Sequence, residues 1–280
     1  RMSVVVRPED VETFIEACRE ENIHAVVVAK VTDKPNLVMT WNGQTIVDLE
    51  RSFLDTNGVR VVVDAKVVDN AVNLPELRQT SLEILEEDLK TILSDLNHAS
   101  QKGLQTIFDS SVGRSTVNHP LGGRYQLTPT ESSVQKLPVQ DGVTTTASVM
   151  AQGYHPYLAE WSPYHGAAYA VIEATARLVA TGANWSKARF SYQEYFQRMD
   201  KQAERFGQPV AALLGSIEAQ IQLGLPSIGG KDSMSGTFEE LTVPPTLVAF
   251  GVTTANSRKV LSPEFKNVGE NIYYIPGQAL

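Results

Sequence analysis

The sequence predicts an α+β (mixed α/β) protein built from two compact units, and three observations support this. The composition, with 42% hydrophobic and 20% charged residues, is typical of a globular chain and excludes fibrous and disordered classes. The length of 280 residues exceeds that of a typical single domain. Short β-branched runs, which predict strands, alternate with apolar residues at helical spacing. We therefore expect two units, or parts of them.

Charge and hydropathy exclude several functional classes. Acidic residues outnumber basic ones by 32 to 24, so the net charge of −8 gives no electrostatic reason to bind nucleic acid. The longest apolar runs, such as residues 25–29, have the size of strands and cannot span a bilayer. The single cysteine, Cys18, permits no internal disulfide and is compatible with a reducing cytosol. We expect a cytoplasmic protein without nucleic-acid or membrane partners.

The first 58 residues predict a small α+β unit. Pro8 opens a helix with acidic residues in its first turn, where the helix dipole favours them. Asn42-Gly43 is a strong signal for a hairpin between two strands. The strands are expected at residues 3–6, 24–31, 37–41 and 45–49. Because a strand pattern begins at Ser3 without a signal peptide, we expect the chain to be cut from a longer protein.

A strand at 59–63 and a long amphipathic helix at 74–96 connect this unit to the next. The leucine spacing of the helix resembles heptads, but about three heptads are too few for a coiled coil, so a linker or packing helix is expected. A shorter helix ends at Phe108. Residues 109–140 are rich in Gly, Pro, Ser and Thr and predict a loop region.

The second unit is expected to contain a strand at its start, three helices and a later strand. The predicted strands are residues 142–147 and 246–254, and the predicted helices are residues 167–180, 193–206 and 210–223. Gly182, Gly207 and Gly224 are expected to end the helices, and Pro209 is expected to begin the third one.

The glycine-rich segment 229–236, Gly-Gly-Lys-Asp-Ser-Met-Ser-Gly, is the first candidate site. Glycines allow a ligand to approach the backbone, and Lys231 could neutralise a phosphate. Asp232 and Ser233 add a metal-type oxygen and a hydroxyl. The segment is not a Walker-type P-loop, because Leu225 stands where a glycine is required and Asp232 follows the lysine. The alternative is a tight surface turn with incidental charge.

The second candidate pairs Asp141, at the mouth of the predicted strand 142–147, with Glu173 on an otherwise apolar helix. A carboxylate on a buried helix is costly unless it is paired or bound to a cation. Two such oxygen donors would suit Mg²⁺ carried by a phosphate ligand. The alternative is that Glu173 forms an ion pair with Arg177, one turn further along the helix.

His155 and His165, ten residues apart in an aromatic loop, could carry out acid–base chemistry or be structural. They are not a zinc pair, since no further ligands stand at a recognised spacing. The sequence contains no nucleophile elbow, Cys-x-x-Cys or dinucleotide fingerprint. Residue patterns alone therefore predict a phosphate- or nucleotide-binding α/β domain.

Three motifs occur in a familiar order. They are Phe-Asp-Ser-Ser-Val-Gly at 108–113, Asp-Gly-Val-Thr-Thr-Thr-Ala-Ser at 141–148 and Gly-Lys-Asp-Ser-Met-Ser at 230–235. Together they resemble the synthetase region of the long-chain form of phosphoribosylformylglycinamidine synthase, a relative of aminoimidazole ribonucleotide synthetase. The resemblance covers nearly the whole chain.

The resemblance implies a domain organisation. Residues 1–62 would be the C-terminal part of the first synthetase B domain, and residues 63–97 a helical linker. Residues 98–256 would be the second A domain, with a sheet that forms half a barrel flanked by helices. Residues 257–280 would begin the second B domain. In this family the active site belongs mainly to the first half, so the second half would hold an auxiliary ATP or ADP with Mg²⁺.

The resemblance also implies site residues. Asp141 and Glu173 would be the Mg²⁺ ligands. Arg177 stands where the family has an asparagine ligand, and an arginine cannot ligate a cation but could neutralise Glu173 or meet a phosphate. The nucleotide would contact Arg177 and the other members of the candidate set, which are Gln140, Asp141, Lys231, Asp232 and Ser233.

The activity implied is the ATP- and glutamine-dependent ligation that converts formylglycinamide ribonucleotide to formylglycinamidine ribonucleotide in purine biosynthesis. The expected partners are the remaining synthetase and glutaminase domains of the same chain. Cys18 is not the glutaminase nucleophile, so the isolated segment is expected to be inactive and to self-associate. The alternatives are an architectural half that binds no nucleotide, or another ATP-dependent relative of aminoimidazole ribonucleotide synthetase.

Overall fold

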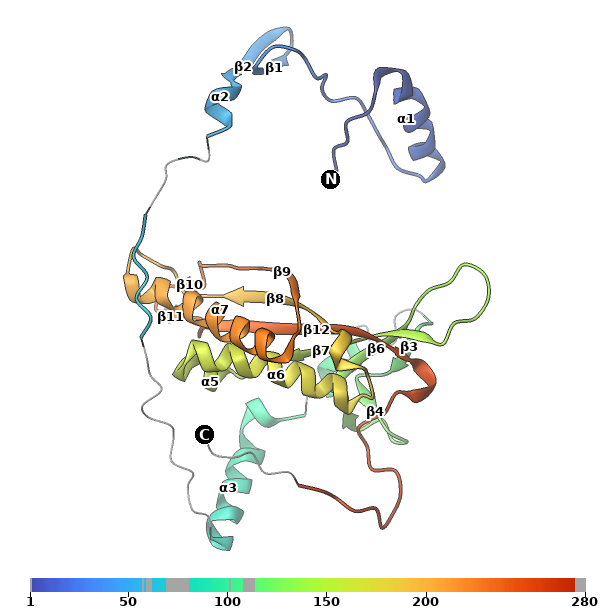
Figure 1. Ribbon diagram of the computed structural model, residues 1–280, viewed down its shortest axis with the longest axis vertical. Helices are drawn as coiled ribbons and strands as arrows, with labels where there is room; N and C mark the ends of the chain where they lie inside the picture. Colours follow the sequence, from blue (N-terminus) through green and yellow to red (C-terminus); the bar gives the residue numbers. More distant parts are fainter. Residues whose placement is uncertain are drawn as a thin grey trace. The chain divides into compact units, whose positions relative to one another are not determined.

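The computed structural model describes residues 2–56, 58, 62–68, 81–100, 102–107 and 114–274 (Figure 1). The chain divides into two units, Arg1–Val62 and Val63–Leu280. The assignment of these residues to particular synthetase A and B domains stays a prediction. Mixed helices and strands are present, so the predicted α+β fold class is confirmed.

The described residues of the first unit form three helices and one hairpin. The short 3₁₀ helix η1 (Pro8–Asp10) leads into α1 (Val11–Glu20). The predicted hairpin is confirmed: β1 (Asn36–Trp41) pairs antiparallel with β2 (Gln44–Glu50), and α2 (Arg51–Leu54) follows. Asn42 and Gly43 adopt φ values of 48° and 78°, the left-handed backbone that a two-residue hairpin turn requires.

Two predicted strands of the first unit are not formed. Residues 3–6 and 24–31 pair with no strand in the part of the chain that is described. Neither Cys18, which is half-buried on α1, nor any other described residue of this unit is fully buried. A β-branched segment needs a neighbouring strand to complete its hydrogen bonds, and the described residues supply none.

Helical segments open the second unit. The predicted long helix is confirmed over α3 (Leu82–Ser94), where the Ser81 hydroxyl caps the N-terminus by accepting from the backbone N–H of Ile84. The 3₁₀ helix η2 (Leu96–His98) and α4 (Lys102–Ile107) follow. Residues 74–80 of the predicted helix, residues 59–61 of the predicted strand and the motif at 108–113 lie outside the described residues.

A six-stranded sheet forms the centre of the second unit, in the order β3-β6-β7-β12-β8-β9. Its members are β3 (Thr116–Asn118), β6 (Ser132–Lys136), β7 (Thr146–Gly153), β8 (Arg189–Tyr195), β9 (Ser227–Lys231) and β12 (Thr246–Asn256). Only the β8–β9 pair is parallel among the pairings of this sheet. The sheet does not close on itself among the described strands, so the predicted barrel contribution stays a prediction.

Two short hairpins and two 3₁₀ helices lie around the sheet. The hairpins pair β4 (Leu121–Gly122) with β5 (Thr128–Pro129), and β10 (Thr237–Phe238) with β11 (Leu241–Thr242). The 3₁₀ helices are η3 (Trp185–Lys187) and η4 (Ser257–Lys259).

Helices cover one face of the sheet. The helix α6 (Pro163–Ala180) packs on β7 and β12, α5 (Pro156–Trp161) precedes it, and α7 (Ala203–Leu223) packs along α6 (Figure 1). Alternate residues of the strands point into this core, among them Val149, Phe190 and Ala249, each with no exposed surface. Small residues of α6 allow close packing here.

The opposite face of the sheet is left open. The side chains that alternate with the core residues are partly exposed: Met150 is 43% exposed, Tyr195 43% and Val252 40%. A mainly antiparallel sheet can pack one face against helices and leave the other face exposed to solvent. In the described part of the chain, no helix is both long enough and apolar enough to cross a membrane.

Four element predictions for the second unit are wrong. The predicted loop region at 109–140 contains β3 and β6, which pair with each other in the central sheet. Residues 193–195 form the end of β8 (Arg189–Tyr195) rather than the start of a helix over 193–206, because this strand alternates buried and exposed side chains between two partner strands. The strand predicted at 142–147 begins only at Thr146. Pro209 lies inside α7, and Gly207 does not end a helix.

Gly207 has a different role from the predicted break. A Cβ atom at this position would overlap the carbonyl of Lys66, whose backbone N–H donates to the carbonyl of Ala203 at 2.8 Å. The segment around Lys66 therefore crosses α7 in backbone contact, and only glycine leaves room for it.

Candidate functional site

The Lys231 segment lies at the end of β9, fixed along β8 by hydrogen bonds. The side-chain amide of Gln193 donates to the carbonyl of Lys231 at 3.0 Å, and the N–H of Ser233 donates to the carbonyl of Glu194 at 3.0 Å. A Cβ atom at Gly230 would lie 2.9 Å from the carbonyl oxygen of Tyr192. The glycines before Lys231 therefore permit close strand pairing, and the predicted loop begins only after the lysine.

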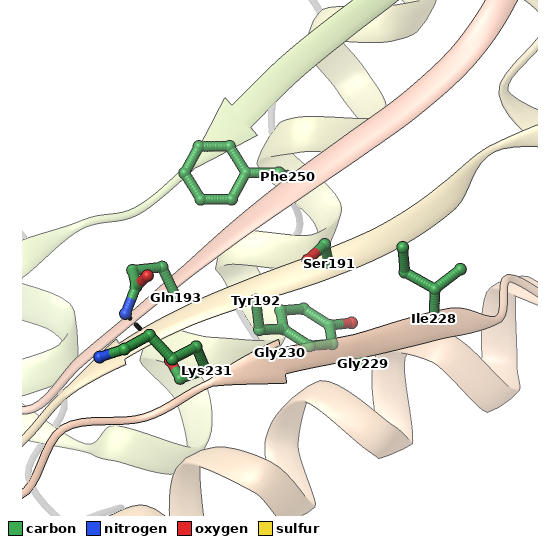
Figure 2. A pocket seen from close by; sticks show the side chains of 8 residues that line it. All are labelled: Ser191, Tyr192, Gln193, Ile228, Gly229, Gly230, Lys231 and Phe250. Carbon is green, nitrogen blue, oxygen red and sulfur yellow. Dashed lines mark hydrogen bonds between the residues drawn. The ribbon is translucent and has the colours of Figure 1, made fainter. Parts of the chain in front are cut away.

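An open pocket of about 440 Å³ lies beside this segment on the uncovered face of the sheet. Figure 2 shows Gln193 and Lys231 side by side at one end of the pocket, with Phe250 of β12 and Ile228 of β9 on its other sides. Lys231 is exposed, and its ammonium donates to the backbone carbonyl of Asp232 at 3.5 Å. No ion pair joins this lysine to a carboxylate in the described ranges, so its charge is available to an anion.

Two titratable groups of β8 that the sequence analysis did not single out lie buried under this segment. Glu194 is 6% exposed and Tyr192 is 7% exposed. Burial raises the pKa of the Glu194 carboxyl, and the charge of Asp232 raises it further. Burial also raises the pKa of Tyr192, with a contribution from Glu194. The alternation of residues 189–195 would have placed both on the core face, had the segment been read as a strand.

The Tyr192 hydroxyl is buried and has no hydrogen-bond partner among the residues described. A buried hydroxyl without a partner costs free energy, because it has lost its bonds to water. The side chains of Tyr192 and Glu194 thus place a hydroxyl and a carboxyl among the buried residues of β8.

Glu173 and Arg177 form an ion pair on α6, as the structural alternative predicted. The distance from Arg177 Nη2 to Glu173 Oε1 is 2.9 Å. The second oxygen of Glu173 accepts from the backbone N–H of Tyr154 at 2.8 Å. Arg177 also contacts Glu131, with 2.8 Å between Nε and Oε2, and donates through Nη1 to the carbonyl of Gln152 at 2.8 Å.

Gln140 and Asp141 lie in an exposed bend that precedes the first residue of β7. Glu173 lies near the opposite, C-terminal end of this strand. Glu173 contacts the residue directly after Gly153, the last residue of β7, whereas Asp141 precedes Thr146, the first. A strand of this length separates its ends by roughly 23 Å. The structure therefore does not bring Asp141 and Glu173 together.

Lys231 on β9 lies at the same end of the sheet as the contact between Glu173 of α6 and Tyr154, which directly follows β7. The pairings of Lys231 with Gln193, of Gln193 with Val248, and of Ala249 with Gly153 place them near one level. Three interstrand steps separate β9 from β7, which corresponds to roughly 14 Å. The three predicted groups thus do not converge on one pocket.

The residues present do not fit a Mg²⁺ site made by the chain itself. No group of three or more His, Cys, Asp or Glu side chains that could hold a metal ion occurs in the described ranges. Both oxygens of Glu173 already have partners. We therefore assign no chemistry to a metal held by Asp141 and Glu173.

Both candidate histidines have structural contacts. His155 Nδ1 accepts from the backbone N–H of Leu158 at 3.2 Å and so caps α5. His165 Nδ1 lies 2.8 Å from the Ser162 hydroxyl, which caps α6. These contacts support the structural alternative for both side chains.

Comparison with known proteins identifies a group of relatives, although no protein-family model matches the chain. The subunit PurL of phosphoribosylformylglycinamidine synthase from Nocardia farcinica is 29% identical over 256 residues, covering 89% of this chain and 31% of that protein. PurL from Streptomyces avermitilis is 27% identical over 285 residues, covering 98% of this chain and 36% of the relative. The chain is therefore similar to PurL over nearly its whole length. It spans about a third of the length of these relatives. The resemblance predicted from its motifs is confirmed.

Solved structures of PurL share the fold. Thermotoga maritima PurL complexed with ATP aligns with a TM-score of 0.64 at 18% identity, covering 93% of this chain and 38% of that one. The PurLQS structure from the same organism aligns with a TM-score of 0.66 at 19% identity, covering 93% and 39%. These alignments support the α+β fold observed in the chain.

Proposed function

We propose that the chain is a segment of phosphoribosylformylglycinamidine synthase, the ATP- and glutamine-dependent ligase that converts formylglycinamide ribonucleotide to formylglycinamidine ribonucleotide. The observation that carries this proposal is the similarity to PurL over 98% of the chain at 27% identity. Structures of T. maritima PurL complexed with ATP, ADP and FGAR share the fold and agree with such an activity. The long-chain form remains part of the proposal.

The segment's place in that enzyme is the second synthetase half. Its partners would be the remaining synthetase and glutaminase domains of the same cytoplasmic protein. No catalytic residue is assigned to the segment, because neither candidate histidine is free of a structural contact. We expect formylglycinamidine synthase activity only when the other domains are supplied, and activity of the isolated chain would contradict this assignment.

Nucleotide binding in this half is proposed at the Lys231 segment. The supporting observations are an exposed lysine without a carboxylate partner in the described part of the chain, and the open pocket beside it. Asp232 and Ser233 follow directly and complete the proposed contacts. Gln140, Asp141 and Arg177 lie elsewhere, so Mg²⁺ enters the proposal only as the ion that ATP or ADP carries.

The architectural alternative is a half that shapes the enzyme and binds no nucleotide. The Glu173–Arg177 ion pair and the remote position of Asp141 favour it, because they remove the predicted metal ligands from any shared pocket. The similarity to PurL favours a segment of this enzyme, whether it binds a nucleotide or is architectural, over another ATP-dependent relative of aminoimidazole ribonucleotide synthetase.

Isothermal titration calorimetry with Mg·ADP distinguishes the two forms. The wild-type chain should release heat on binding, and Lys231→Ala should weaken the affinity about tenfold through loss of a charge-assisted contact. Asp141→Asn should bind like the wild type, because Asp141 is remote from the pocket. Lys259→Ala, an exposed lysine of η4, is the matched control. No heat, or equal heats for the wild type and Lys231→Ala, would leave only the architectural form.

A further inference from the structure

Arg177 lies where three separate elements meet. Glu131 stands between β5 and β6, Glu173 is on α6, and Gln152 is near the end of β7. The guanidinium reaches all three, at 2.8 Å to Glu131, 2.9 Å to Glu173 and 2.8 Å to the carbonyl of Gln152. Each nitrogen of the planar group thus has its own acceptor.

Two carboxylates that approach one point repel each other unless a cation lies between them. The side chain of Glu131 is 53% exposed, that of Glu173 is 36% exposed and that of Arg177 between them is 28% exposed, so water screens part of this repulsion and the guanidinium offsets the rest. The guanidinium is always charged and presents donors in a rigid fork. A divalent ion could also neutralise two carboxylates, but as a small sphere bound by oxygen atoms.

We propose that the guanidinium of Arg177 serves as a permanent cation at the place where Glu131, Glu173 and the carbonyl of Gln152 meet, which we call the Arg177 corner. It fills the position between Glu131 and Glu173 that a divalent ion would otherwise occupy, and it makes the local structure independent of metal. Through Gln152 and the Glu173 contact to Tyr154, it also fixes the end of β7 against α6. Arg177 is therefore a positioning residue, and the inference does not depend on the proposed enzyme activity.

The test is a titration of the full chain with Mn²⁺, combined with thermal unfolding in EDTA and in Mn²⁺. The wild type should bind no Mn²⁺ at this corner and should show the same Tm in both solutions. Arg177→Met should lower the Tm in EDTA by roughly 2–4 °C. It should also gain one Mn²⁺ site, because Glu131 and Glu173 then share an uncompensated negative charge, and Mn²⁺ should restore the Tm.

Two controls separate this role from ordinary packing. Arg205→Met removes an arginine of similar exposure, 25%, that contacts a single carboxylate, Asp200. It should lose stability without gaining Mn²⁺. Adding Glu131→Gln to Arg177→Met should abolish the gained site.

If Arg177→Met does not fold, Arg177→Gln removes the charge while keeping a polar side chain, and the same gain of Mn²⁺ is expected. Mn²⁺ binding to the wild type that Glu173→Gln removes would overturn the proposal. A variant at Arg177 that folds with an unchanged Tm or gains no Mn²⁺ would overturn it as well.

Discussion

Glu194 couples the stability of the second unit to pH. Its carboxyl lies on the core face of β8, and burial, with help from the charge of Asp232, raises its pKa. The folded protein therefore holds this proton at a pH where the unfolded chain has lost it. Protonation of Glu194 therefore contributes to the free energy of unfolding. This contribution is fully present below the ordinary glutamate pKa of 4.5 and is lost as the pH rises through the raised pKa of the folded state.

Glu194→Gln should consequently be more stable than the wild type at neutral pH, because the amide has no charge to bury. The difference should shrink toward zero below the ordinary glutamate pKa, since both side chains are then neutral. Urea unfolding across this pH range measures both quantities. Asp232→Asn should give a smaller gain of the same sign, because it removes only the secondary cause. Parallel stability profiles for the wild type and Glu194→Gln would contradict the effect of burial.

At the residue scale, the sequence predicted local contacts better than distant ones. The Glu173–Arg177 pair follows from i, i+4 spacing on one helix, and it was identified as an alternative. The third member, Glu131, comes from a separate element and gave no signal. The expected meeting of Asp141 and Glu173 depended on a strand at 142–147. Because β7 begins at Thr146 and extends to Gly153, the two acids lie at its opposite ends.

At the element scale, the same division between local and tertiary control appears. The Asn42-Gly43 turn and most of α6 were predicted because their signals are local. The predicted helix began at residue 167, whereas α6 begins at Pro163, after the Ser162 cap. The sequence predicts residues 193–195 as the start of a helix, because the apolar spacing at 195–206 also fits a helical period. Pairing with β12 and β9 decides in favour of a strand, and single-sequence periodicity does not contain those partners.

The packing of α7 on α6 depends on Gly215. A Cβ atom there would overlap the carbonyl oxygen of Tyr164, which belongs to the backbone and cannot rotate away. Gly215→Ala should therefore destabilise the protein by about 1–3 kcal/mol, despite the better helix propensity of alanine. Urea unfolding measures the loss.

The matched control is Gly103→Ala in α4, where an added Cβ atom meets nothing within 4 Å. This variant should be as stable as the wild type, or slightly more stable because alanine favours helix. A Gly215→Ala protein with wild-type stability would show that the two helices do not approach as closely as described.

At the scale of the whole molecule, the uneven covering of the sheet matters most. Helices bury one face, while Met150, Tyr195 and Val252 remain partly exposed on the other. Exposed apolar side chains gathered on one sheet face mark contact sites. The chain spans only about a third of the length of its PurL relatives, and under the proposed function the remaining domains would cover this face. The isolated chain can offer only another copy of itself.

We therefore expect the isolated chain to self-associate through the open sheet face, with a sedimentation coefficient that rises with protein concentration. Val252→Lys places a charge in the centre of this face, where its burial in a dimer would be costly, and should weaken association at least tenfold. Val179→Lys is the matched control, because Val179 is 50% exposed on the helical side. It should associate like the wild type. A wild-type monomer at high concentration, or equal weakening by both lysines, would show that the open face is not the surface that joins the copies.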